Sequence, residues 1–191
     1  MIRMEISKSF YAADRKAWRA WLSKNHKRGK EVWLIYYKKS SKKPRIPYND
    51  AVDEALCFGW IDSTVKKMDE EKFAQRFTPR RPTSGLSQMN RERIRKLIAD
   101  KRMTKAGLDA VAHAFKPEAD HDFFIIPPGI LKAIKKNPEA WAHFRKLPKH
   151  YVRIRIAYIK SQGRHSRDAF KRSLRHFIKM TAKNKRFGFV R

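Results

Sequence analysis

The spacing of hydrophobic residues predicts both helices and strands in the first 115 residues of the chain. Apolar side chains recur at helical spacing in four segments, 13–24, 48–58, 87–100 and 105–115. A continuous apolar run at 32–37 predicts a central strand that is covered on both faces. Segments 60–68 and 72–78 flank an acidic turn and predict a β-hairpin. We therefore expect an α+β fold in which a small, mostly antiparallel sheet packs with helices.

The pattern changes after residue 115 and becomes largely helical. Residues 116–128 are locally acidic and end in two prolines, which favours a linker. Three later segments have helical spacing, namely 130–136, 138–146 and 166–183. Residues 152–156 alternate as a strand would, although Tyr151, Ile154 and Tyr158 also lie about one helical turn apart. We expect an α/β domain at 1–115, a linker at 116–128 and a basic helical module at 129–191.

Charge is concentrated at the C-terminal end of the chain. The 191 residues include 47 Lys and Arg against 18 Asp and Glu, a formal net charge of +29. Residues 140–191 contain 16 basic residues and one acidic residue, Asp168. Such a segment cannot neutralise itself through i, i+4 pairs, so it predicts a surface that contacts polyanions, either nucleic acid or anionic lipid headgroups. The predicted contacts are Arg153, Arg155, Arg164, Arg167, Lys171, Arg172, Arg175 and Lys179. The alternative is a solubilising surface in a cell of unusual salt, temperature or pH.

Several classes of protein are excluded by what the sequence lacks. The single cysteine, Cys57, rules out an intramolecular disulfide and is expected to be buried and inert. No two glycines lie within 20 residues of one another, which excludes a dinucleotide fingerprint or a Walker loop. No histidine pair has the spacing of a helix-borne metal site, so we expect neither a metal nor a cofactor. Without an apolar run near ~20 residues or a signal sequence, we expect a cytoplasmic protein with no transmembrane segment.

Charged and aromatic residues between positions 33 and 80 form a candidate binding site. Strand ends and helix termini are where open α/β sheets place ligands, and four charged residues are expected to converge there: Lys38, Asp62, Arg76 and Arg80. Beside the aromatic residues Trp33, Tyr36 and Trp60, they would suit a small anionic, planar ligand. The alternative is architectural, with Asp62 paired to Arg76 or Arg80 and with Trp60 in the core.

The same region carries a resemblance to a known family. The motifs are Val-Trp-Leu-Ile-Tyr-Tyr-Lys-Lys at 32–39, Ala-Leu-Cys-Phe-Gly-Trp-Ile-Asp at 55–62 and Arg-Phe-Thr-Pro-Arg at 76–80, followed by Asn90 and the segment 102–108. Their order resembles the YdeI/OmpD-associated, or bacteriocin-protection, family. A weaker resemblance continues through Ile-Pro-Pro at 126–128 to Tyr151. The chain departs from the family at Leu86-Ser87, where a Trp-Ser pair is usual, and its C-terminal part is more basic.

This resemblance implies an α/β domain followed by a small helical module, which makes 151–161 a helix, and it adds Asn90 to the candidate ligand-binding residues. It implies a part in tolerance of bacteriocins or cationic peptides but no established reaction, so whether the chain is an enzyme stays open. Our first hypothesis is a non-enzymatic polyanion-binding or stress-tolerance protein. The alternatives are a small-anion site or enzyme at the sheet end, and a peripheral binder of membrane surfaces. The oligomeric state is left open.

Overall fold

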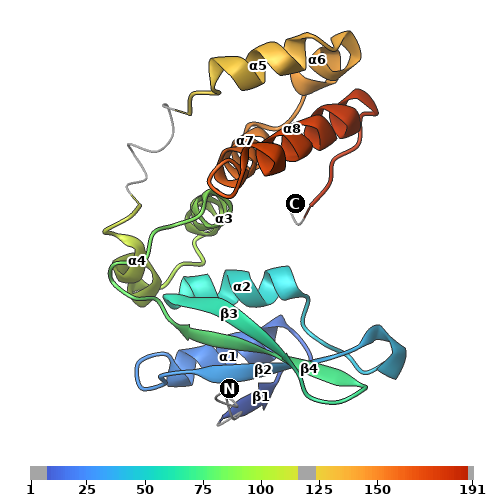
Figure 1. The fold of residues 1–191 in the computed structure, drawn as a ribbon. Coiled ribbons are helices and arrows are strands. Elements are labelled where there is room, and N and C mark those ends of the chain that lie inside the picture. Colours follow the sequence, from blue (N-terminus) through green and yellow to red (C-terminus); the bar gives the residue numbers. More distant parts are fainter. Residues whose placement is uncertain (1–7, 116–123, 189–191) are drawn as a thin grey trace. The chain divides into compact units, whose positions relative to one another are not determined.

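The computed structural model describes residues 8–115 and 124–188, which divide into two compact units. The first unit runs to Leu86 and resumes at Arg93–Phe115. The second contains Ser87–Glu92 and the chain from Lys116 on. Of the expected linker, residues 116–123 lie outside the described part. Figure 1 shows that all of the strands labelled there belong to the first unit, whereas the second is helical. The fold class is therefore α+β with a helical C-terminal part, as predicted.

The sheet of the first unit has four strands in the order β1-β2-β4-β3. Their bounds are β1 Ser9–Tyr11, β2 Val32–Tyr37, β3 Trp60–Lys67 and β4 Lys72–Pro79. Strand β1 is parallel to β2, and the other two pairings are antiparallel. The β3–β4 hairpin and the central position of β2 confirm the sequence predictions. The neighbours Trp33 and Leu34 point to opposite faces of β2 and are both buried, which confirms that both faces of this strand are covered.

Helices α1 (Arg15–Asn25) and α2 (Tyr48–Cys57) pack on the sheet through a common apolar core. Helix α1 begins two residues after the predicted start, because Asp14 caps it: the Asp14 side chain accepts a hydrogen bond from the Ala17 amide at 2.8 Å. Helix α2 ends before Gly59, whose φ of +76° supplies the left-handed conformation that a glycine adopts without strain. The buried core includes Trp18, Leu22, Leu34, Leu56, Trp60 and Phe77. A short 3₁₀ helix, Lys39–Ser41, follows β2.

Helices α3 (Gln88–Ala99) and α4 (Lys105–Val111) complete the central part of the chain. Helix α4 ends four residues earlier than predicted, and its apolar residue Leu108 is exposed. The orientation of α4 is set by Gly107, which packs directly on the end of α2: a Cβ at this position would lie 2.2 Å from the Cys57 carbonyl oxygen. The buried face of α4 therefore runs through Gly107 and Val111, and this turns Leu108 outward.

The second unit packs four helices around its own core. They are α5 Pro128–Lys135, α6 Pro138–Phe144, α7 Lys149–Gln162 and α8 Arg167–Ala182. The strand-like alternation of 152–156 lies inside α7, so the helix that the resemblance implies at 151–161 is confirmed and the strand interpretation is wrong. Burial of Tyr151, Ile154, Arg155 and Ile159 at helical spacing explains why the segment is a helix. In the part of the chain that the structure describes, none of the helices is long and apolar enough to span a bilayer.

Candidate functional site

The two tryptophans of the predicted sheet-end site are part of the protein interior. Trp33 and Trp60 are each about 1% exposed, and the Trp60 indole donates a hydrogen bond to the His26 carbonyl at 3.2 Å. Trp60 also packs against the edge of Trp21, with ring centroids 5.8 Å apart. Neither Trp33 nor Trp60 presents an aromatic face to solvent. Their large side chains stabilise the first unit by burial.

Strand register separates the predicted cations. Pairing of β2 with β4 sets Arg76 opposite Trp33 and Lys72 opposite Tyr37. Lys38 follows Tyr37, so it lies five residues along β2 from the Arg76 position, roughly 17 Å away. The expected convergence of Lys38 with Arg76 and Arg80 on one end of the sheet is therefore corrected. An antiparallel partner brings the start of one strand to the end of the other, and single-sequence patterns do not reveal this register.

Arg76 of β4 and Arg80, which follows β4, each have hydrogen-bond partners inside the first unit. Arg76 donates to the Glu31 carboxylate from Nε at 2.8 Å and from Nη2 at 2.5 Å. The Arg80 side chain donates from Nη2 to the carbonyls of Ser84, at 3.2 Å, and Gly85, at 2.8 Å. Burial lowers the pKa of Arg80 from its ordinary value. Within the described ranges, neither arginine forms an ion pair with Asp62. The Asp62–arginine pairing of the architectural alternative is therefore absent there.

Asp62 instead accepts a hydrogen bond from the hydroxyl of Tyr48, the first residue of α2, at 2.7 Å. The Tyr36 hydroxyl nearby is buried and has no hydrogen-bond partner among the described residues. Burial, together with the Asp62 charge, raises the pKa of both phenols, that of Tyr48 to about 12. Tyr36, Tyr48 and Asp62 therefore form a small group in which both phenols are neutral near pH 7.

Sequence reasoning did not identify Tyr48 as a member of this group. The available signal is the order helix–glycine–strand, because a strand that folds back along the preceding helix runs from the C-terminus of that helix towards its N-terminus, where Tyr48 lies. The remaining predicted residue, Asn90, lies in Ser87–Glu92, which belongs to the second unit. Its backbone amide donates to Ser87 Oγ at 3.2 Å, in the first turn of α3. Ligand binding by the predicted set stays a prediction.

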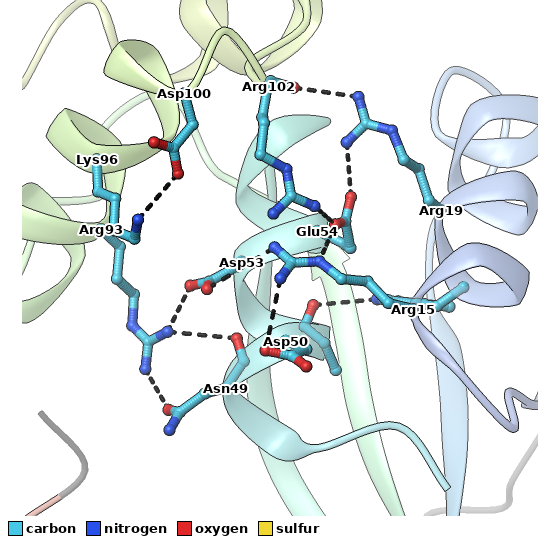
Figure 2. A network of polar contacts seen from close by, with 12 residues as sticks. Arg15, Arg19, Asn49, Asp50, Asp53, Glu54, Arg93, Lys96, Asp100 and Arg102 are labelled. Atoms are coloured by element: carbon cyan, nitrogen blue, oxygen red, sulfur yellow. Dashed lines mark hydrogen bonds and ion pairs between the residues drawn. The ribbon is translucent and has the colours of Figure 1, made fainter. Parts of the chain in front are cut away.

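The densest polar network of the first unit surrounds Glu54 of α2 (Figure 2). Its carboxylate is completely buried and accepts hydrogen bonds from Arg15 Nε at 2.5 Å and from Arg19 Nη1 at 2.6 Å. Arg102 donates to the same carboxylate, and Arg19 also donates to the Arg102 carbonyl at 3.1 Å. Arg15 and Arg19 are four residues apart on α1, so both reach one side of α2. The network joins α1, α2 and the turn before α4.

The neighbouring acidic residues of α2 extend this network. Arg15 Nη1 lies 3.6 Å from Asp50, and Arg93 of α3 donates to Asp53 and to the Asn49 side chain, each at 2.5 Å. Figure 2 shows the arginine side chains pointing towards α2 from both sides. Four guanidinium groups thus face three carboxylates, which leaves little net charge for an external anion. Sequence reasoning missed this network, although acidic residues clustered on one face of the 48–58 helix were a usable signal.

The network also affects the pKa of Cys57. Burial alone would lower the pKa of Arg19, but its hydrogen bond to Glu54 and the charge of Glu54 raise it above the ordinary value. Burial raises the pKa of the Cys57 thiol and the Glu54 charge raises it further, and together they outweigh the lowering by Arg19 and Arg102. The thiol is therefore protonated near neutral pH, which makes it a poor nucleophile. This agrees with the expectation that Cys57 is buried and inert.

The second unit carries the predicted polyanion-binding residues, and the structure divides them into two groups. Arg153 is bound to Glu92 by two hydrogen bonds, Nε to Oε1 at 2.5 Å and Nη2 to Oε2 at 2.7 Å. Arg155 is buried within the unit. The other six are exposed and form what we call the basic face, made of Arg164, Arg167, Lys171, Arg172, Arg175 and Lys179. In the described part of the chain, no member of the basic face takes part in an ion pair.

The basic face follows from the sequence of α8. Ser166 caps this helix by accepting a hydrogen bond from the Ala169 amide at 3.0 Å. The apolar stripe of α8 packs against the core of the second unit: Phe170, Leu174, Phe177 and Ile178. Arg167, Lys171 and Arg175 are spaced four residues apart, so they lie on one side of the helix. The single acidic residue of α8 is Asp168 in its first turn, where the helix dipole favours a negative charge.

Comparison with known families assigns the two parts of the chain to two family models. Residues 10–110, more than half of the chain, match the domain of unknown function DUF8412. Residues 124–184 match the family described as bacteriocin-protection, YdeI or OmpD-associated. The family suspected from sequence is therefore confirmed for residues 124–184, where the resemblance is weaker, whereas the motifs at 32–80 lie in the part that matches DUF8412. No curated protein and no solved structure matches the chain. The chain thus belongs to the DUF8412 family, and a YdeI or OmpD-associated, bacteriocin-protection domain follows in its helical part.

Proposed function

We propose that the helical part binds nucleic acid, with the basic face as its contact surface for phosphates. The observation that supports this is a set of six exposed cations without ion pairs among the described residues. Like charges on one helix repel each other, and this repulsion is relieved when a polyanion lies along the helix. Binding also releases the counterions that are condensed on the nucleic acid, which favours association at low salt.

Nucleic acid is favoured over a membrane surface because of the opposite side of α8. An interfacial helix inserts its apolar face between lipid headgroups and acyl chains. The apolar stripe of α8 already packs against the core of the second unit, and Phe177 is fully buried. Lipid binding through α8 would therefore rest on charge alone. A cytoplasmic location, where nucleic acid is an abundant polyanion, stays a prediction.

The small-anion alternative at the sheet end has less support. Of its three cations, Lys38 lies at the other end of β2, Arg76 is bound to Glu31, and Arg80 is bound to two backbone carbonyls. The remaining group, Tyr36, Tyr48 and Asp62, combines one carboxylate with two neutral phenols, so it does not attract an anion. Bacteriocin protection, named in the description of the matched family, stays a proposal for this chain.

The test is binding of a fluorescent DNA duplex by the full chain at low salt. The variant K171Q/R172Q/R175Q/K179Q removes four charges from the basic face and should lose most of the affinity. The matched control K24Q/K27Q/R28Q/K30Q removes four exposed charges from the first unit and should bind nearly as wild type. Absence of wild-type binding at low salt, or equal losses in the two variants, would contradict the proposal. If the chain binds anionic vesicles more tightly than DNA in co-sedimentation, its partner is a lipid surface and the proposal is contradicted.

A further inference from the structure

Arg155 of α7 is a buried cation without a counter-ion. Its residue exposure is 9%, and its guanidinium makes no ion pair or hydrogen bond within the described ranges. Nε is fully buried and unpartnered, whereas the terminal nitrogens Nη1 and Nη2 retain contact with solvent. A buried charge is unfavourable unless it is paired and hydrogen-bonded. Burial accordingly lowers the pKa of Arg155, although an arginine stays charged at any physiological pH.

Aromatic rings hold this guanidinium in place. Its central carbon lies 4.0 Å from the centroid of the Phe187 ring and 5.0 Å from that of Tyr158. The chain after α8 returns to this point, where the Phe187 amide donates to the Tyr151 hydroxyl at 3.1 Å. Gly188 follows with a φ of +86°, and a Cβ there would lie 3.1 Å from Arg155 Nη1. The guanidinium is therefore oriented before any ligand arrives, which reduces the entropy lost on binding.

The described residues of the second unit do not supply the charge that would neutralise Arg155. Residues 124–188, the described C-terminal range, contain two acidic residues, Glu139 and Asp168, and neither forms an ion pair with Arg155. Glu92, the acidic residue that Ser87–Glu92 adds to the second unit, is bound to Arg153. The charged groups of this unit are otherwise mostly cations. A counter-ion for Arg155 must therefore come from outside the described part of the chain.

We propose that the guanidinium of Arg155, clamped between Tyr158 and Phe187, is a subsite for a phosphate group. This rests on the proposed function and deepens it, because it adds one oriented contact to the diffuse charge of the basic face. A planar guanidinium presents two parallel N–H donors that match two phosphate oxygens. Tyr158 is 47% exposed beside it, so a nucleobase attached to that phosphate can stack on its ring. The phosphate belongs to a nucleic acid or to a free anion.

Thermal unfolding with inorganic phosphate tests the subsite independently of nucleic acid. Wild type should melt at a higher temperature in phosphate than in chloride of equal ionic strength. R155M keeps the apolar contacts and removes the buried charge, so it should melt no lower than wild type in chloride and lose the phosphate-dependent rise. R28M removes one exposed charge from the first unit and should keep that rise. No phosphate-specific rise in wild type, or a full rise in R155M, would overturn the subsite.

Oligonucleotide binding separates the two sources of the phosphate. If the phosphate belongs to nucleic acid, R155M should lose affinity about tenfold or more, as expected for one charge-assisted contact, while R28M changes it little. R155K keeps the charge but loses the planar guanidinium with its two parallel N–H donors, so it should lose affinity while retaining the wild-type salt dependence. R155K also serves as the test if R155M does not fold. A wild type that is stabilised by phosphate but binds no oligonucleotide would contradict the proposed function and leave the subsite to a free anion. Equal affinities of R155M, R155K and R28M would overturn the nucleic-acid source.

Discussion

Arg102, in the turn between α3 and α4, donates a hydrogen bond to the buried carboxylate of Glu54 in α2. The two residues are separated by 48 positions in the sequence. Because Arg15 and Arg19 of α1 donate to the same carboxylate, one acidic side chain joins three segments of the first unit. Because this carboxylate is buried, removal of its charge or of one of its three guanidinium partners leaves a charge uncompensated and destabilises the fold.

Glu54→Gln should therefore lower the free energy of unfolding by about 3–5 kcal/mol, since it removes the negative charge and leaves three arginines beside one neutral amide. Urea unfolding of both proteins measures this difference. Glu70→Gln is the matched control, because Glu70 is 83% exposed and pairs with Lys67 at the surface. It should change stability little. A Glu54→Gln protein as stable as the control would show that the network is dispensable.

Gly107→Ala should lower stability by about 1–3 kcal/mol or more, because the new methyl group would overlap the backbone at Cys57, 2.2 Å from its carbonyl oxygen. That neighbour is backbone at the end of α2, so it cannot rotate away. Gly129→Ala in α5 is the control, since nothing lies within 4 Å of its Cβ position. Calorimetric melting should show a loss for the first variant and none for the second. Equal melting temperatures would refute the close packing of α4 on α2.

Asp62→Ala should cost only about 1 kcal/mol, because the side chain loses one hydrogen bond, from the partly exposed Tyr48, and leaves no buried arginine unpaired. Chemical denaturation of the variant measures this. A loss as large as that of Glu54→Gln would mean that Asp62 has a buried charged partner after all.

Ionisation of Tyr48 should reduce stability at high pH. Its pKa is raised to about 12 in the folded protein and is near 10 in an unfolded chain, so the unfolded state loses its proton first. The contribution is fully present below about pH 10 and is lost as the pH rises towards 12. Spectrophotometric titration of the phenols should show a lower midpoint for Tyr48 in Asp62→Asn, which removes the charge and the strong acceptor. An unchanged titration curve would contradict the Tyr48–Asp62 contact.

Local sequence signals predicted most of the elements because each element carries its own pattern. The apolar run of β2, the cap at Asp14 and the stop at Gly59 are all set by residues within a few positions of one another. Strand β1 was missed because three residues, Ser9–Tyr11, are too few to show a period. In α7, β-branched residues alternate as they do in a strand, but the segment is a helix because packing of one helix side on the core stabilises that conformation.

The candidate site was less predictable because it depends on contacts between distant residues. Lys38 and Arg76 were placed together only because both lie near strand ends, and the antiparallel register of β2 with β4 separates them. The donors to Glu54 lie 35, 39 and 48 positions away, beyond the reach of any local pattern. The basic face was predictable, since charge and helical spacing are both local. The ion pair of Arg153 with Glu92 and the burial of Arg155 depend on tertiary packing and were not predictable.

The salt dependence of DNA affinity distinguishes a phosphate-binding face from a surface that is merely soluble. For a duplex, the log–log slope of the association constant against salt concentration should change by roughly 0.9 for each phosphate contact. The four-charge variant of the basic face should therefore have a slope shallower than wild type by up to about 3.6. The four-charge control in the first unit should keep the wild-type slope. The same slope in wild type and in the basic-face variant would contradict nucleic-acid binding by this face.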